Sequence, residues 1–314
     1  MRAVTIVDKS LVVEADYPDP VPGFQQVLVR VKAAGLNGAD LLQVRGAYPA
    51  PPGSPHDIPG LEFAGEVVGL GDGAARFEVG DRVMGIVGGG GQAELLTCNE
   101  RQLMPVPPSL DIVEAGGFAE AFTTAHDALV TQAGLRPGER LLVHGAAGGV
   151  GTAAVQIGRA LGASVVATSR HEQFDERLEH LGAEVVTRPG EHFGFGPFDV
   201  VLELIGGSNI NEDVKALALN GRICVIGVGG GIKAELNLLA LMAARGRVMA
   251  STLRSRPLEE KAATARAVER ELFPFVDRGQ MAVPIAESFP VEEVEQAYAH
   301  FKAGGKFGKV IITF

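Results

Sequence analysis

Four glycines directly follow a short apolar run in residues 140–151, RLLVHGAAGGVG; they are Gly145, Gly148, Gly149 and Gly151. The next residues, TAAVQIGRALGA, repeat apolar side chains at helical spacing, so the order is strand, glycine turn, helix. Backbone N–H groups at the start of such a helix attract anions, and glycines let a diphosphate approach without a Cβ in the way. A tight turn alone also explains a glycine cluster, and the spacing departs from strict G-x-G-x-x-G. The strand and helix around it nevertheless favour dinucleotide binding.

A second strand-like segment, ASVVATSR at residues 163–170, ends where a dinucleotide-binding fold meets the adenosine ribose. A carboxylate at that point would bind the 2′-hydroxyl of NAD, but the chain has Thr168, Ser169 and Arg170 there. Ser169 can donate to a 2′-phosphate, and Arg170 can pair with it or stack on adenine. These residues favour NADPH over NADH, although a solvated surface arginine is the alternative interpretation of Arg170.

Composition limits the classes of partner. The chain has 314 residues, 46% of them hydrophobic, which is enough for a large core and two domains. A net charge of −10 without a basic run argues against binding to nucleic acid or to an anionic membrane. No stretch of 18 uninterrupted apolar residues predicts a membrane span. Cys98 and Cys224 lie in apolar stretches without ligand spacing, so we expect buried free thiols and a cytoplasmic protein.

The elements that must position these residues fall into two groups. Residues 1 to about 120 are short strands separated by turn signals, which predicts a barrel-like β unit that begins with a hairpin. Within it, residues 37–44 predict one or two helical turns, followed by a proline-rich loop that contains Tyr48. Residues 113–135 indicate two helices. Beyond them strands alternate with helices, which predicts a parallel, doubly wound sheet and an α/β fold. The last strand is expected to return to the first domain.

Many separate segments, in order along the whole chain, resemble the zinc-free quinone oxidoreductases of the medium-chain dehydrogenase/reductase superfamily, and most of all the inducible quinone oxidoreductase branch. The segments are LNGADLLQVRGAYPAPPG, IPGLEFAGEVVGLG, HGAAGGVGTAAVQIGRALGA, LELIGGS, LALNGRICVIG, RGRVMASTLRSR and GKFGKVII. The resemblance implies a GroES-like catalytic domain of residues 1–121 plus 263–314 and an NADP-binding Rossmann domain of residues 122–262. It also implies NADPH as the hydride donor and a homodimer or homotetramer.

The sequence departs from the zinc-dependent relatives at their catalytic metal. Their cysteine and their His-Glu pair correspond here to Asn37, Leu61 and Glu62, so these positions cannot form the catalytic zinc site. The block of four cysteines for structural zinc is also missing, and no metal ligands are predicted. Without a Lewis acid, acceptors that delocalise negative charge, such as quinones or conjugated enones, are favoured over alcohols. Gln92 replaces a usual aromatic residue, which would open the substrate pocket or make it more polar.

The resemblance assigns roles to individual residues. Tyr48 would lie over the nicotinamide and hydrogen-bond a substrate carbonyl, and Asn37 would bind a substrate oxygen or the nicotinamide ribose. Asp40 is a third catalytic candidate, although a role in fixing the helix start suits it as well. His126, His144 and His300 have no ligand spacing and are interpreted as structural. The expected cofactor-binding residues are Asn37, Thr124, Gly148, Gly149, Val150, Ser169, Arg170, Arg188, Gly206, Gly229, Gly230, Phe307 and Lys309.

The sequence therefore predicts an NADPH-dependent, zinc-independent reductase that transfers hydride to a small quinone or enone. A trans-2-enoyl thioester reductase with the same cofactor is one alternative. A non-catalytic NADPH-binding structural or regulatory protein is another.

Overall fold

The computed structural model describes residues 1–314, which divide into two compact units. One unit combines Met1–Glu120 with Leu253–Phe314, and the other is Ala121–Thr252. The sequence places the second boundary between residues 262 and 263, whereas residues 253–262 belong to the first unit. One reason is Arg254, whose guanidinium donates to the carbonyls of Tyr48 and Gly88 in that unit.

The β-rich unit is built on a seven-stranded sheet. Its strand order is β14-β15-β3-β4-β5-β7, and β6 pairs with β3. The strands are β3 (Gln26–Gly35), β4 (Glu62–Leu70), β5 (Arg82–Ile86), β6 (Leu95–Asn99), β7 (Leu103–Pro105), β14 (Ile285–Pro290) and β15 (Lys309–Thr313). Because β15 pairs with β3, the expected return of the last strand to the first domain is confirmed. The predicted hairpin at the start of the chain is also present, as β1 (Ala3–Val7) and β2 (Ser10–Glu14).

Helices of the same unit complete its core. They are α1 (Gly38–Val44), α7 (Leu258–Asp277) and α8 (Val294–Ala303). On α8, Val294 and Tyr298 pack against Val310 and Ile312 of β15, so the apolar face of the helix is buried against the sheet. The short α1 begins directly after Asn37, where one or two helical turns are predicted.

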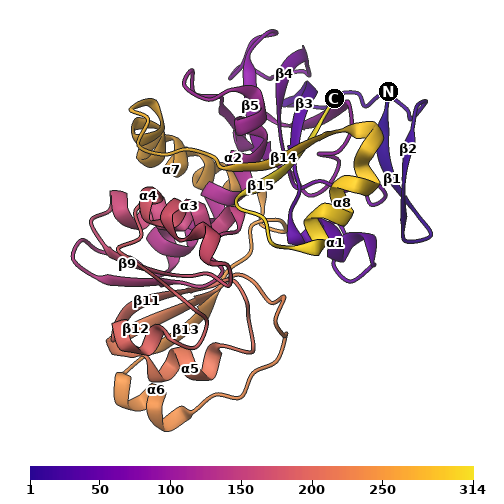
Figure 1. The fold of residues 1–314 in the computed structure, drawn as a ribbon. Helices are drawn as coiled ribbons and strands as arrows, with labels where there is room; N and C mark the ends of the chain where they lie inside the picture. The colour runs from indigo at the N-terminus through magenta and orange to yellow at the C-terminus, as the bar shows by residue number, and fades with distance from the viewer. The chain divides into compact units, whose positions relative to one another are not determined.

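The Ala121–Thr252 unit has a six-stranded parallel sheet with the order β10-β9-β8-β11-β12-β13. Its strands are β8 (Arg140–Val143), β9 (Ser164–Thr168), β10 (Val185–Thr187), β11 (Phe198–Glu203), β12 (Leu217–Val225) and β13 (Arg247–Ala250). Its helices are α3 (Gly149–Ala160), α4 (Asp175–Leu181), α5 (Ile210–Lys215) and α6 (Leu238–Ala244). Figure 1 shows α3 and α4 on one face of the sheet and α5 and α6 on the other. This doubly wound order reverses between β8 and β11, and such a switch point is where ligands bind.

The prediction of two helices in residues 113–135 is wrong. A single helix, α2 (Ile112–His126), continues directly into a π-helical segment, Asp127–Gln132. The glycine pair inside it does not interrupt the helix. A Cβ on Gly116 would lie 2.5 Å from the Cβ of Ala33, so the glycine permits close packing on β3.

Both cysteines are free and buried, as predicted. Burial raises the pKa of each thiol to about 12, so neither is a thiolate at neutral pH. None of the helices is both long and apolar enough to cross a membrane.

Candidate functional site

The turn after β8 has a backbone conformation that requires glycine at two positions. Gly145 has φ +63°, and a Cβ on Gly151 would lie 2.5 Å from the Gly145 carbonyl oxygen. The turn leads into α3, which has Gly148 as its N-cap and starts at Gly149, with Val150 in its first turn. The first N–H groups of a twelve-residue helix therefore follow the carboxyl end of a parallel strand, an arrangement that suits a diphosphate.

The loop after β9 gathers the residues predicted to face the ribose. The Ser169 hydroxyl contacts the backbone N–H and carbonyl of His171, each at 3.2 Å. Arg188 donates to the Ser169 carbonyl oxygen at 2.8 Å and also pairs with Asp175. Arg170 is exposed and forms no ion pair. The structure thus brings Ser169 and Arg188 together, and it leaves Arg170 as the cation without a carboxylate partner.

The loops after β11 and β12 pack against each other. Gly206 has φ +109°, and a Cβ there would lie 2.7 Å from the Cα of Val228. The N–H of Gly230 donates to the Ile205 carbonyl at 2.6 Å, so Gly206 and Gly230 lie in one loop pair. Gly229 is exposed, with open space where a Cβ would be. In the same unit, Thr124 is buried on α2.

In the β-rich unit, Asn37 belongs to a buried polar network with Glu62 and Lys309. The Asn37 amide donates to Glu62 at 3.0 Å and to the Gly35 carbonyl at 3.1 Å. The Lys309 ammonium donates to Asn37 Oδ1 at 2.8 Å and to the Leu36 carbonyl at 2.9 Å, and it lies 2.5 Å from Glu62 Oε1. These three acceptors match the three N–H donors of the lysine. The network therefore fixes the Asn37 side chain.

Asp40 holds the backbone around this network. Its carboxylate accepts from the N–H of Asn37 at 2.8 Å and from the N–H of Gly60 at 3.1 Å. Complete burial raises the pKa of Asp40 to about 7, although these two hydrogen bonds and the nearby Lys309 act in the opposite direction. Asp40 thus fixes the start of α1, which is the second role that the sequence suggests for it.

Arg254 holds Tyr48 in place, and sequence reasoning missed it. Its guanidinium is buried, lies 4.9 Å from the centre of the Tyr48 ring, and donates to the Tyr48 carbonyl at 3.0 Å. It also donates to Gly88 O at 2.8 Å and to the side chain of Gln43. The sequence signal available was an arginine in the family-like segment RGRVMASTLRSR, without anything to show its partners.

Two further predicted positions are buried in the same unit. Phe307 is 3% exposed. Gln92 is fully buried, and its Oε1 accepts from the Tyr298 hydroxyl at 2.9 Å.

The three positions that, by the resemblance, correspond to the catalytic zinc ligands of zinc-dependent relatives do not fit a metal. Leu61 offers no donor atom, and the Asn37 amide is held by three hydrogen bonds. Glu62 accepts from the N–H of Glu120 at 2.7 Å and pairs with Lys309. An ammonium already neutralises the carboxylate that would bind the ion, so we derive no catalytic step through zinc at these residues.

Comparisons with known proteins agree with this geometry. The family model for the alcohol dehydrogenase GroES-like domain matches residues 23–133, and the model for zinc-binding dehydrogenase matches residues 149–269. Quinone oxidoreductase of Rattus norvegicus is 31% identical over 327 residues, covering 99% of this chain and 97% of the relative. The quinone oxidoreductase of Homo sapiens is 30% identical with the same coverage.

Solved structures share the fold. The quinone oxidoreductase of Thermus thermophilus, studied also in complex with NADPH, has a TM-score of 0.87 and 32% identity, with both chains fully covered. An NAD-dependent alcohol dehydrogenase has a TM-score of 0.88 and 27% identity, also with full coverage. The fold and the glycine turn define an oxidoreductase that uses a nicotinamide cofactor. The chain belongs to the quinone oxidoreductases of the medium-chain dehydrogenase/reductase superfamily.

Proposed function

We propose that this protein is an NADPH-dependent, zinc-independent reductase that transfers hydride to quinones or related conjugated carbonyl compounds. The observation that carries the proposal is the network of Asn37, Glu62 and Lys309. By the resemblance, Asn37 and Glu62 correspond to positions of catalytic zinc ligands in zinc-dependent relatives. The relatives named quinone oxidoreductase, at about 30% identity over the whole chain, support the same choice of acceptor.

The Ala121–Thr252 unit would hold the cofactor, which supplies the hydride when bound. Gly148, Gly149 and Val150 would bind the diphosphate through the N-terminus of α3. Ser169 and the unpaired cation of Arg170 would bind the 2′-phosphate, while Arg188 steadies the loop through Ser169 and Asp175. Thr124, Gly206, Gly229 and Gly230 are proposed to line the remaining cofactor path.

The acceptor would meet Asn37 and Tyr48 in the other unit. Both N–H groups of the Asn37 amide are already used, so its role is to accept a hydrogen bond through the second lone pair of Oδ1. The Tyr48 hydroxyl would donate to the carbonyl oxygen on which negative charge develops. A quinone spreads that charge over two oxygens, so solvent can deliver the proton without a strong general acid. Phe307 and Lys309 would then contribute to the shape of the acceptor site.

A direct test follows NADPH oxidation with 1,4-naphthoquinone and with crotonyl-CoA under the same conditions. We expect turnover with the quinone, and a Tyr48→Phe variant that is roughly tenfold to hundredfold slower with unchanged NADPH affinity. Tyr17→Phe is the matched control, because the Tyr17 hydroxyl bonds Asp57 instead. Wild-type turnover confined to crotonyl-CoA would refute the quinone assignment.

One comparison favours a second candidate, an enoyl thioester reductase. A polyketide synthase of Streptomyces halstedii is 33% identical over 294 residues, which cover 92% of this chain but 5% of that protein. Its name places the relative in polyketide synthesis, where acyl thioesters are substrates.

The non-catalytic alternative has its own test. It gains support if NADPH raises the melting temperature of the protein but no quinone, enone or thioester oxidises NADPH.

We also propose a cytoplasmic homodimer or homotetramer that pairs through β13. This strand is one of the two edges of the parallel sheet, and Val248 on it is 40% exposed. On the neighbouring α6, Leu239 is 77% exposed and Met242 is 71% exposed. Light scattering on the wild type and on Val248→Lys would test this, with a smaller assembly expected for the variant.

A further inference from the structure

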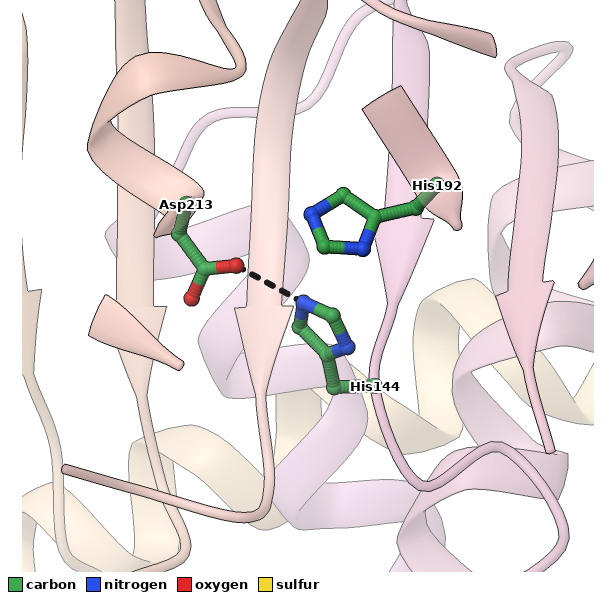
Figure 2. Close-up of side chains that lie close together, drawn as sticks. All are labelled: His144, His192 and Asp213. Atoms are coloured by element: carbon green, nitrogen blue, oxygen red, sulfur yellow. Dashed lines mark hydrogen bonds and ion pairs between the residues drawn. The ribbon is translucent and has the colours of Figure 1, made fainter. Parts of the chain in front are cut away.

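Three side chains far apart in the sequence meet inside the Ala121–Thr252 unit. His144 directly follows β8, His192 lies in a 3₁₀ turn at His192–Phe195, and Asp213 belongs to α5. One potential ligand atom from each lies within 4.8 Å of the others, and Figure 2 shows the two rings and the carboxylate turned toward one another. All three are buried, with exposures of 1%, 2% and 0%.

A fourth donor lies beside them. The carboxylate of Glu203, at the end of β11, is 3.9 Å from His144 Nε2 and fully buried. His144 Nε2 lies 2.8 Å from Asp213 Oδ1, and His144 Nδ1 lies 3.2 Å from the hydroxyl of Thr168. The cluster is therefore centred on the point where the strand order of the sheet reverses, between β8 and β11.

Several atoms of the cluster lack a hydrogen-bond partner. They are both ring nitrogens of His192, Asp213 Oδ2 and Glu203 Oε2. A proton shared between Asp213 and Glu203 accounts for the two carboxylate oxygens. Buried polar groups of native proteins are nearly always satisfied, so the two ring nitrogens of His192 suggest a missing partner.

We propose that His144, His192, Asp213 and Glu203 bind one divalent transition metal ion of the zinc class. Two imidazoles and two carboxylates suit a tetrahedral ion, and the charges of the carboxylates balance that of the metal. With bonds of about 2.0–2.2 Å, the ligand atoms of a tetrahedral ion lie about 3.3–3.6 Å apart. The atoms now separated by up to 4.8 Å must therefore approach by roughly 1 Å, while His144 Nε2 and Asp213 Oδ1, now 2.8 Å apart, must separate slightly. The Thr168 hydroxyl on His144 Nδ1 supplies the outer contact that orients a ligating histidine.

The site would be structural, because four protein ligands leave no open position. The metal would also fix the two glycine-containing loops that follow β8 and β11. The N–H of Gly145 donates to Thr168 Oγ1 at 3.3 Å, and the N–H of Gly206 donates to Glu203 Oε1 at 2.7 Å. The site differs from the zinc position of the family, which lies at Asn37, Leu61 and Glu62 in the other unit. The sequence did not predict these four ligands, since His144, His192, Glu203 and Asp213 do not follow the spacing of a known metal-binding motif.

The test strips the full-length protein with a chelator and titrates it with Co²⁺ and then Zn²⁺. We expect one equivalent of metal, visible Co²⁺ absorption bands that Zn²⁺ abolishes, and a higher melting temperature with metal. His192→Asn and Asp213→Asn should each weaken binding at least a hundredfold. His56→Asn is the matched control, because the His56 side chain is 93% exposed, and it should bind as the wild type does.

X-ray absorption of the wild-type zinc form gives a second readout that does not depend on a variant's folding. Nitrogen and oxygen donors with two imidazoles are expected. Binding of less than one equivalent, retention of the metal in both cluster variants, its loss in His56→Asn, or a sulfur ligand in the absorption data would overturn the proposal.

Discussion

Replacing Lys309 by methionine should destabilise the β-rich unit by removing one partner of a buried ion pair. The Lys309 side chain is 4% exposed and that of Glu62 is fully buried, with the ammonium 2.5 Å from the carboxylate. Breaking such a pair leaves an uncompensated buried charge, which costs about 3–5 kcal/mol. For a unit of this size, each kcal/mol lowers the melting temperature by about 2–4 °C, so a fall of about 6–20 °C is expected.

A double-mutant cycle separates the pair from ordinary packing. Glu62→Gln should also destabilise the protein, because it leaves the ammonium without its anion. The double variant Lys309→Met/Glu62→Gln should cost less than the two single changes together by more than about 1 kcal/mol. Lys302→Met is the control, since Lys302 is exposed on α8 and should change stability by no more than about 0.5 kcal/mol.

The measurement is urea unfolding at pH 7, combined with calorimetry. A loss of less than about 1 kcal/mol for Lys309→Met, or strict additivity in the cycle, would show that the pair is not what holds Asn37. Because Lys309 also donates to Asn37 Oδ1, the variant should lose quinone turnover more than it loses affinity for the cofactor.

Other substitutions test single contacts. Arg170→Asp should lower the ratio of kcat/KM with NADPH to that with NADH by about tenfold or more, because a carboxylate replaces the unpaired cation. Arg254→Ala should reduce kcat/KM for the acceptor, because Tyr48 loses the guanidinium that holds it. The Kd of NADPH, measured by fluorescence titration, should stay unchanged. Arg254→Lys should not restore activity, since an ammonium cannot replace the planar guanidinium. The raised pKa of Asp40 means that the folded state binds its proton more tightly than the unfolded state. Stability should therefore fall as the pH rises from about 4 to 7, by up to about 4 kcal/mol, and urea unfolding of Asp40→Asn should lose that slope.

The sequence predicted those features that depend on neighbouring residues. Apolar alternation identified the strands, and the order strand, glycines, helix identified the start of α3. The number of helices in residues 113–135 could not be read from the local pattern, because a glycine such as Gly116 that permits close packing looks the same in sequence as one that breaks a helix. The distinction depends on Ala33, which lies on a strand far away in the chain.

The polar networks could not be predicted in the same way. Lys309 and Asn37 are 272 residues apart, and Arg254 and Gln43 are 211 residues apart. No local pattern links such positions, and a lysine at the start of an apolar strand is equally consistent with a cofactor contact. The likeness to relatives placed Asn37 and Tyr48 among the candidates, but the residues that hold them became visible only in the structure.

The same network limits what chemistry the proposed reductase can perform. Lys309 provides a positive charge next to Glu62, but its three N–H groups are used by three protein oxygens. The ammonium therefore has no donor left with which to bind a substrate oxygen, unlike a metal with an open coordination position. An alkoxide formed at this site would therefore receive no hydrogen bond from Lys309. A quinone would delocalise its own charge and would need no Lewis acid, so the hydrogen-bonded Lys309 agrees with the proposed choice of acceptor.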